Sequence, residues 1–298
     1  MRAAAGGEAS ESKRSPRAER GKRGALRVQG PLSYAVLLAL GLIVLFPFYW
    51  MTVTSFKGED QMRSLTSMFW PRPFMAENYQ HLVSKTEFVS WYTNSVIVSV
   101  LSTILATAVG TVGAYALARL KFLGRGFMAS ATLITYLVPP SILFIPLYAQ
   151  IKTLGLANSL FGLVLSYPSF TVPFVTWLLM GYFESIPEEL EEAAMIDGAT
   201  RFGAFRRVIL PLAAPGVLAA SLYAFTQAWN EFLYSLVFIT DARLRTLPVG
   251  LASFITGDVY GWGYLMSGAV LTTLPVIAAY IYLQKYMVEG LTAGSVKG

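Results

Sequence analysis

From Phe88 to Ala118 the chain reads FVSWYTNSVIVSVLSTILATAVGTVGAYALA, without one charged side chain. A helix crosses a hydrocarbon layer with ~20 residues, so this run is long enough to span a membrane. Inside lipid every backbone N–H and C=O must be bonded within its own segment, which makes a helix the expected form. Five more such runs predict an all-α, polytopic membrane protein with six transmembrane helices. The other runs are Leu32–Phe56, Gly126–Ile151, Thr153–Phe183, Val208–Asn230 (continuing past Glu231 to Thr240) and Val259–Gln284.

The composition agrees with lipid as the main solvent. Of the 298 residues, 55% are hydrophobic and 13% are charged, whereas soluble domains carry about 25% charged residues. The mean hydropathy is +0.54. The absence of cysteine excludes disulfides, thiolate catalysis and cysteine-ligated metals. The one histidine, His81, is expected in an exposed loop, and a single imidazole makes neither a zinc cluster nor a catalytic triad.

The distribution of Lys and Arg predicts the orientation. Six spans put both termini on one side, where sixteen basic residues fall, against seven in the opposite loops. The positive-inside rule makes the richer side cytosolic. A basic N-terminal arm can also bind nucleic acid, but beside an apolar span a cytosolic flank is favoured. The first run is too long for the ~7–15-residue core of a signal peptide and has no small-x-small cleavage site after it.

The spans predict five regions of the chain. Residues 1–30 are expected to be a disordered basic cytosolic tail, and residues 31–57 the first transmembrane helix. An outer loop over 58–90 follows, and then a core domain over 91–287 with five helices and a cytosolic loop at 184–207. Residues 288–298 are expected to be a C-terminal cytosolic tail.

The loop at 184–207 is polar and has a helical pattern. Ser185-Ile186-Pro187-Glu188 reads as a capping box with proline in the first turn. The glutamates that follow favour the positive end of the helix dipole, and Gly198 is expected to end the helix. An apolar face would either pack on the bundle or, because several of its residues are small, admit another protein's surface. This face comprises Ile186, Leu190, Ala193 and Ala194.

The spacing within this loop resembles a known family. Glu192-Ala193-Ala194 is followed after three residues by Gly198, after nine more by Val208, and after one more by Leu210-Pro211. This pattern resembles the EAA loop of bacterial ATP-binding-cassette importer permeases, which usually have Ile where Val208 stands. Asp197-Gly198-Ala199 is similar to the carbohydrate-importer version. In that family the loop forms a coupling helix, here over 185–200, that seats in the ATPase subunit and transmits its closure. The resemblance implies ATPase-coupling roles for Glu192, Ala193, Ala194, Asp197 and Gly198.

Three further segments resemble the same family. Pro73–Tyr79 is similar to the "ENY" segment of sugar permeases, and Trp229–Leu233 to their fifth-span "WNEF" motif. Gly290–Gly298 is similar to the tail of the second permease of maltose-type importers, which reaches between the ATPase subunits. Lys297 and Gly298 are therefore expected to be a secondary ATPase contact. The resemblance covers about residues 32–298 and implies the type I importer permease fold.

Nucleotide chemistry is missing from the chain itself. No G-x-x-x-x-G-K-[ST] phosphate loop occurs, so ATP and Mg are expected on partner ATPase subunits, with no cofactor or metal in this chain. The resemblance implies a second homologous permease subunit, two ATP-binding subunits and an extracellular or periplasmic solute-binding protein. It also implies a bacterial or archaeal cytoplasmic membrane, membrane lipid and a sugar substrate as surroundings, and no nucleic acid.

Glu231 is the ionisable residue placed well inside a span. A charge at the centre of a membrane costs about 2.5–3.5 kcal/mol, so it normally faces a wet cavity or a partner. Carboxylates and amides bond sugar hydroxyls, and aromatic rings stack on sugars. Asn230 and Glu231 could instead bond a neighbouring span and hold the bundle together. The expected substrate-pathway residues are Gln227, Trp229, Asn230, Glu231 and Tyr234.

Prolines interrupt the third and fourth spans, which frees backbone carbonyls that are tolerable where they line a cavity. A single proline more simply kinks a helix, but five across two spans favour a pathway-lining pair. These are Pro139, Pro140, Pro146, Pro168 and Pro173.

The expected function is that of a non-catalytic permease subunit that moves a carbohydrate, such as a di- or oligosaccharide, by alternating access. Glycerol phosphate, polyamine or phosphonate is an alternative cargo, although the spans hold no Lys or Arg for an anion. A membrane enzyme or scaffold without an ATPase is a further alternative, but the spans carry no cluster of catalytic residues.

Overall fold

The computed structural model describes residues 30–64, 69–256 and 259–295. The chain divides into two compact units, Met1–Tyr49 and Trp50–Gly298. The boundary between them falls inside helix α1 (Pro31–Ser55), which is the expected first span. In the first unit the apolar side chains of α1 are exposed, that of Ile43 by 69%. The tail predicted for residues 1–30 lies, apart from Gly30, outside the described residues.

The second unit contains two long helices, α4 (Phe88–Arg119) and α15 (Trp262–Ser295), and many shorter elements. The shorter helices are α2 (Glu59–Ser64), α3 (Glu77–Lys85), α5 (Arg125–Leu137), α6 (Pro140–Thr153), α7 (Leu160–Ser166), α8 (Pro168–Glu184), α9 (Glu188–Ile196), α10 (Arg201–Ala204), α11 (Leu210–Leu212), α12 (Ala214–Trp229), α13 (Leu233–Phe238) and α14 (Leu247–Ala252). A π-helical turn η1 (Phe205–Ile209), a 3-10 turn η2 (Ala242–Leu244) and the strands β1 (Ile255–Thr256) and β2 (Val259–Tyr260) complete the unit.

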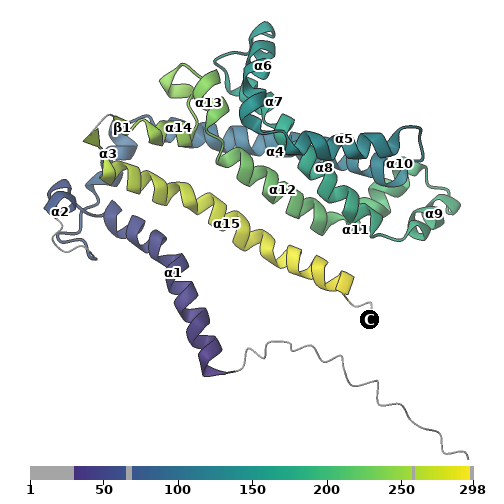
Figure 1. The fold of residues 1–298 in the computed structure, drawn as a ribbon, viewed down its shortest axis with the longest axis horizontal. Coiled ribbons are helices and arrows are strands. Elements are labelled where there is room, and N and C mark those ends of the chain that lie inside the picture. Colours follow the sequence, from purple (N-terminus) through teal and green to yellow (C-terminus); the bar gives the residue numbers. More distant parts are fainter. Residues whose placement is uncertain (1–29, 65–68, 257–258, 296–298) are drawn as a thin grey trace, which may run out of the picture. The chain divides into compact units, whose positions relative to one another are not determined.

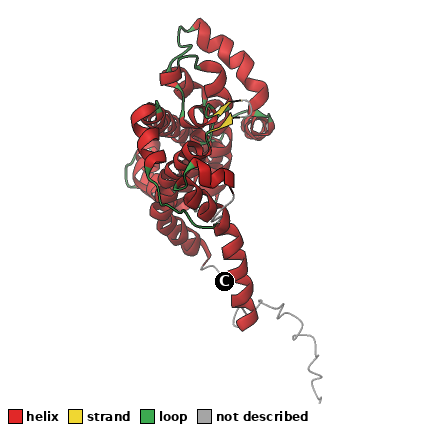
Figure 2. Ribbon diagram, turned by 90° about the vertical axis from the view of Figure 1, so that its left-hand side faces the viewer, coloured by secondary structure: helices red, strands yellow, loops and turns green. Residues whose placement is uncertain are grey.

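Helices α4, α8 and α12 pack against one another and form the core of the second unit (Figure 1). Helix α15 packs along α12 and also contacts α3, while α5 packs on α8. The strands β1 and β2 pair antiparallel, with Ile255 opposite Tyr260, in a small hairpin (Figure 2). The prediction of an all-α protein is confirmed, with this hairpin as the departure among the described residues.

Helices α4 and α8 approach closely where α4 carries small residues. A Cβ atom at Gly110 would lie 2.5 Å from Cγ1 of Val175, a side chain that is fully buried. Small residues allow such approach between helices in membranes. At Gly113, one turn later, the nearest atom would be Thr176 Cγ2 at an ordinary 3.7 Å. Of the two glycines, Gly110 is the one that the packing requires.

Four helical stretches of the described chain are long and apolar enough to cross a membrane: α1, α4, α7–α8 taken together, and α15 as far as Gln284. The number rises to six, as predicted, if each of two bent pairs counts as one span. Helices α5 and α6 meet at 100°, and residues 201–212 meet α12 at 75°. The third expected span is therefore not one straight helix. Val138 before Pro139 is extended, because the residue before a proline is disfavoured in the α conformation.

Three other predicted boundaries differ in the structure. The fourth run was expected from Thr153, but Gly155 and Asn158, with φ of +72° and +53°, form a turn before α7. The fifth helix ends at Trp229 instead of continuing past Glu231. The sixth starts at Trp262 and continues to Ser295, through most of the expected tail.

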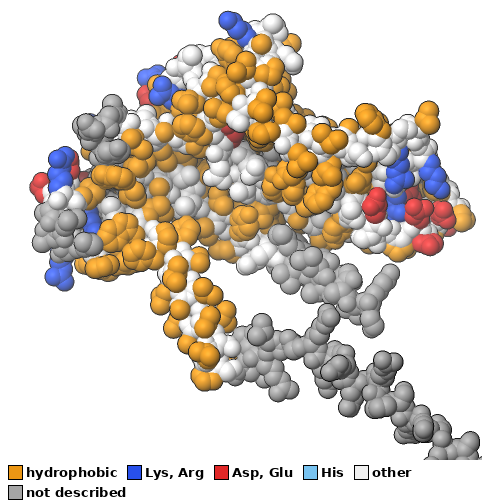
Figure 3. Space-filling model, in the orientation of Figure 1, with side chains coloured by type: hydrophobic (Ala, Val, Ile, Leu, Met, Phe, Trp, Pro, Cys, Tyr) orange, Lys and Arg blue, Asp and Glu red, His pale blue; other side chains and the backbone are white. Residues whose placement is uncertain are grey.

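Charged side chains of the second unit gather at its two ends and, in smaller number, around α6 and α13, and much of the remaining surface is hydrophobic in this view (Figure 3). One end carries α9 and α10, and the other carries α2 and α3 (Figure 1). Ion pairs lie at each end, Arg63–Glu59 in α2 and Arg125–Glu184 near α9. This separation suits a bundle that crosses a membrane, because charges are costly in hydrocarbon.

The α4–α8 contact yields a paired prediction. Gly110→Ala should lower the free energy of unfolding by about 1–3 kcal/mol, because the added methyl group overpacks against the stiff Val175 side chain. Gly113→Ala, on the same helix, should be neutral or stabilising, since it has room and alanine favours a helix over glycine. The check is the thermal midpoint of each detergent-purified variant. Equal midpoints for both variants would contradict the packing described here.

Candidate functional site

The loop at 184–207 begins differently from the predicted capping box. Ser185 Oγ donates to the carbonyl of Tyr182 at 2.7 Å, so this side chain closes α8 and does not cap α9. Pro187 holds the N-cap position of α9 without a side-chain hydrogen bond. The capping-box prediction is therefore wrong, because a carbonyl at the end of α8 competes for the serine. The glutamates Glu188, Glu189 and Glu191 do lie in the first turn of α9, where the helix dipole favours carboxylates.

The end of α9 is where the sequence predicted it. Gly198 has φ +91°, its N–H donates to the carbonyl of Met195 at 3.1 Å, and Ala199 N–H donates to that of Ala194 at 3.0 Å. These two bonds form a Schellman cap, which favours glycine at the left-handed position. The expected coupling helix over 185–200 is thus shorter. Thr200 already belongs to the next turn, because its Oγ1 accepts the N–H of Gly203 at 3.1 Å.

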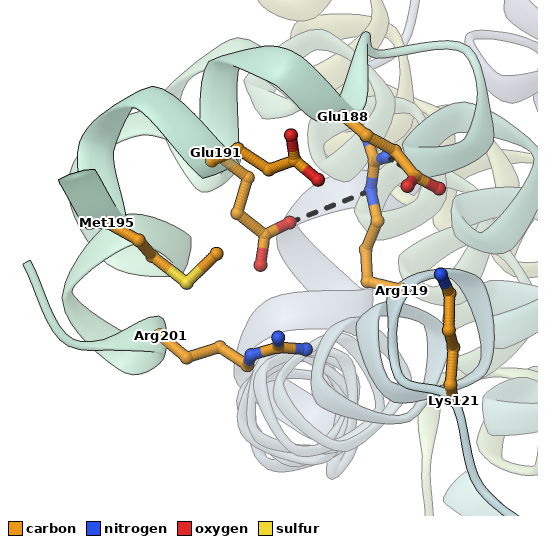
Figure 4. Close-up of a pocket in the computed structure, with 7 residues that line it drawn as sticks. Arg119, Lys121, Glu188, Glu191, Met195 and Arg201 are labelled. Atoms are coloured by element: carbon orange, nitrogen blue, oxygen red, sulfur yellow. Dashed lines mark ion pairs between the residues drawn. The ribbon is translucent and has the colours of Figure 1, made fainter.

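Helix α9 is attached to the bundle by a buried polar cluster (Figure 4). Glu191 is the buried residue of α9, and its Oε1 accepts the hydroxyl of Tyr115 at 2.5 Å. Arg119, at the end of α4, has a side chain only 4% exposed, and its Nε lies 3.9 Å from Glu191 Oε2. Its Nη1 lies 3.8 Å from Glu188 Oε1. Its Nη2 donates to the carbonyls of Phe183, at 2.8 Å, and Ile186.

These cluster residues were missed as site residues in the sequence. Arg119 contributed only to the charge count and Glu191 only to the dipole argument. Only part of the signal is local: Tyr115 and Arg119 are four residues apart, so they share one face at the end of α4. Of the cluster, Arg119, Glu188 and Glu191 line a cleft of about 240 Å³ together with Lys121, Glu192, Met195 and Arg201.

The predicted apolar face of α9 is not one face in the structure. Ile186 is buried, but Leu190 is 43% exposed and Ala193 is exposed as well. The reason is that Glu191 occupies the side of α9 that faces the bundle. Two more large apolar side chains project from this region, Ile196, 86% exposed, and Phe202, 69% exposed. Apolar side chains among carboxylates thus face outward around α9.

The structure brings several of the predicted coupling residues together. Ala194, Asp197 and Gly198 line a cleft of about 250 Å³, which Arg207 and Val208 also border. Glu192 lies on the other cleft, beside the Arg119 cluster. Ala193 is exposed on α9. Lys297 and Gly298, the expected secondary contact, lie outside the described residues.

The "ENY" segment fastens the end of the first span within the second unit. Asn78 Nδ2 donates to the carbonyls of Ser55 and Lys57, each at 2.9 Å. The hydroxyl of Tyr79 bonds Ser55 Oγ at 2.7 Å. His81 is exposed as expected, but it lies in α3 and not in a loop, and its ring stacks on that of Tyr264 at 4.5 Å.

The predicted substrate-pathway residues do not converge on one point. Trp229 is buried and donates its indole N–H to the carbonyl of Thr272 at 3.2 Å. Tyr234 is also buried, and its hydroxyl donates to the carbonyl of Pro140 at 3.1 Å. Gln227 and Asn230 are exposed on the last turn of α12, three residues apart. The structure therefore leaves the two amides accessible and gives the two aromatic residues packing roles.

The carboxylate of Glu231 is held by backbone N–H groups and also faces Tyr167 of another span. Its two carboxylate oxygens accept the N–H groups of Tyr234, at 2.7 Å, and Ser235, at 3.2 Å. Both N–H groups belong to the first turn of α13, so the carboxylate caps that helix. Asn230 bonds within its own segment, to the carbonyl of Thr226 at 2.8 Å. Glu231 also interacts with the side chain of Tyr167, in the span Leu160–Glu184, so the expected contact with a neighbouring span holds for Glu231.

Comparisons with known proteins bear on the whole chain. A model of the family described as "binding-protein-dependent transport system inner membrane component" matches residues 106–292. The diacetylchitobiose uptake system permease protein DasC of Streptomyces coelicolor is 38% identical over 264 residues, 89% of this chain and 95% of that protein. The trehalose/maltose transport system permease protein MalG of Thermococcus litoralis is 38% identical over 268 residues, with the same two shares.

A solved structure shows the same fold. It is a chain of a bacterial ABC transporter involved in the import of the acidic polysaccharide alginate. The TM-score is 0.72 at 24% identity, and the likeness covers 86% of this chain and 95% of that one. The prediction of an importer permease fold is confirmed by this likeness.

The cap at Gly198 yields a prediction about α9 itself. Nothing lies within 4 Å of a Cβ atom at this position, so a substitution is strained by its φ and not by a clash. Gly198→Ala should weaken the cap by about 1–2 kcal/mol, whereas Gly198→Asn should weaken it less, because asparagine tolerates the left-handed region. The check is hydrogen exchange of the peptide over 188–204, which should be faster in the alanine variant. If the asparagine variant exchanged faster than the alanine variant, the result would contradict the cap.

Proposed function

The chain belongs to the family of binding-protein-dependent transport system inner membrane components, and from this premise we propose that it is the permease subunit of an ATP-driven carbohydrate importer. It is the non-catalytic member of such a system. ATP and Mg would bind partner ATPase subunits, since the sequence contains no phosphate-binding loop of the G-x-x-x-x-G-K-[ST] type. The observation that carries the proposal is the outward surface of α9.

This surface has the make-up of a docking site. Leu190, Ile196 and Phe202 expose large apolar side chains at the end of the unit where charged side chains gather. Buried apolar anchors with a polar rim are the usual pattern of a protein interface. The residues proposed to couple this surface to a partner ATPase are Glu192, Ala193, Ala194, Asp197 and Gly198.

The small residues among them have a specific role in this proposal. Ala194, Gly198 and the neighbouring Gly203 leave open the cleft of about 250 Å³ beside α9. A side chain of the ATPase partner would enter it, with Asp197 and Arg207 available at its border. Larger residues at these positions would fill the cleft.

Transport would follow from a difference in docking between two states. Closure of the ATPase pair would move α9, and α9 would turn the cavity between this chain and a companion permease from one side of the membrane to the other. Such alternating access requires that the partner bind α9 differently in the two states, because equal binding shifts no equilibrium. We propose that both termini and α9 are cytosolic, and that an external binding protein delivers the solute.

A neutral di- or oligosaccharide is the proposed cargo. The relatives DasC and MalG are named for diacetylchitobiose and for trehalose/maltose. Gln227 and Asn230 support a sugar here, because amide groups exposed on an otherwise apolar span suit hydroxyl groups. Glycerol phosphate and polyamines are less favoured, since α12 presents no charged side chain.

The experiment compares two variants, each of which introduces a glutamate at an exposed position near the same end of the molecule. Ile196→Glu should lower the amount of ATP-binding subunit that co-purifies with the permease by at least about tenfold, because it places a charge in the apolar centre of the docking surface. Leu123→Glu is the control, since this residue is fully exposed in the loop between α4 and α5. Both sites are exposed, so both variants should fold. If neither the native chain nor the control binds an ATPase, the importer proposal fails.

A further inference from the structure

The attachment of α9 to the bundle is unusual in its chemistry. A short amphipathic helix normally packs through an apolar stripe. In α9 the buried side chain is instead that of Glu191, 7% exposed, while Leu190 and Ile196 on the same helix point outward. Ile186, just before the helix, is the nearest buried apolar residue in the loop. The buried side chain of α9 is therefore a carboxylate that faces α4, while the helix also contacts η1 and α10.

The other half of this attachment is equally well defined. Arg119 ends α4, and its guanidinium reaches three segments at once: the end of α8 through the carbonyl of Phe183, the turn before α9 through Ile186, and α9 through Glu188 and Glu191. A guanidinium presents its donors in a fixed planar fork, so it fixes directions as well as distances. Tyr115, one turn earlier on α4, orients the carboxylate of Glu191.

A nearby ion pair shows by contrast what is special here. Arg125 and Glu184 are also 3.8 Å apart at this end of the molecule, but their side chains are 35% and 52% exposed. Water screens such a pair, and it contributes little. Arg119 and Glu191 have side chains only 4% and 7% exposed. Separating them would leave a charge buried without its partner, which is strongly unfavourable.

We propose that Arg119 and Glu191, held in place by Tyr115, form the joint through which a displacement of α9 is passed to α4. The inference rests on the proposed function and deepens it. An apolar contact can slide, but this buried ion pair is fixed on both sides by hydrogen bonds, Glu191 to Tyr115 and Arg119 to the carbonyls of Phe183 and Ile186, so a displacement of α9 acts on α4. Because α4 packs against both α8 and α12, a movement of its end reaches the core of the bundle. Arg119 and Glu191 are thus positioning residues that touch neither ATP nor cargo.

The test uses the whole transporter reconstituted with its companion permease, ATPase subunits and binding protein. Two rates are measured, ATP hydrolysis and uptake of whichever of maltose, trehalose or diacetylchitobiose the native complex carries. Their quotient, sugar taken up per ATP, is the coupling ratio. Glu191→Gln and Arg119→Lys should lower this ratio by at least about fivefold, with hydrolysis maintained. Glu184→Gln, which removes the carboxylate of the exposed pair with Arg125, is the matched control and should leave the ratio within about twofold of the native value.

A double variant separates coupling from folding. Arg119→Gln combined with Glu191→Gln removes both buried charges and leaves only the exposed carboxylate of Glu188, which water solvates, so assembly should recover. The coupling ratio should nevertheless stay low. Recovery of the ratio together with assembly would overturn the joint and leave a structural role only.

Other outcomes are also decisive. If hydrolysis and uptake fall in proportion in the single variants, or if neither changes, the joint is overturned while the importer proposal stands. If the native complex itself neither hydrolyses ATP nor takes up any of the three sugars, the proposed function fails, and the inference that rests on it fails as well. Should Arg119→Lys not assemble, Tyr115→Phe provides the same measurement with a milder change. A native ratio in that variant would count against the joint.

Discussion

A backbone inside hydrocarbon has no water to bond, so each interruption of a span must satisfy its own polar groups. The second unit meets this constraint with side chains that the sequence places at the breaks. Where α12 stops, Glu231 accepts two N–H groups at the start of α13, and Asn230 bonds the carbonyl of Thr226. Where α5 and α6 part, the carbonyl of Pro140 accepts the hydroxyl of Tyr234. These polar residues of the fifth span thus form hydrogen bonds with backbone groups at the breaks.

The same constraint separates the two ends of the bundle from its middle. The core of α4, α8 and α12 is held by close apolar packing, which has no preferred direction beyond the fit of side chains. At the end that carries α9, the contacts are charged and directional, and they centre on Arg119. A helix held in this way can present an apolar outer surface without burying it. A polar inner attachment combined with an apolar outer surface suits a helix that contacts a second protein.

Charge-free runs and turn residues predict much of this from sequence. The runs located the spans, and Gly198 located the end of α9, because each rests on local chemistry. The predictions that failed involve competing hydrogen-bond partners or contacts between residues far apart in the sequence. Ser185 fitted a capping box but bonds Tyr182 instead. The interruption at Pro139 and Pro140 was expected, but its angle of 100° was not. Tyr115 and Glu191 meet across 76 residues, and no local pattern encodes such a contact. The charge of Glu231 was noticed, but two of its partners are backbone N–H groups that only the break in the helix exposes.

The most direct test of the account is ATP-driven uptake by vesicles that contain the complete transporter. The interior is loaded with ATP, and a neutral disaccharide, maltose, is compared with an anionic sugar of similar size. The account predicts accumulation of the neutral sugar only when ATP and the external binding protein are both present. Uptake without ATP, or accumulation of the anionic sugar alone, would contradict it.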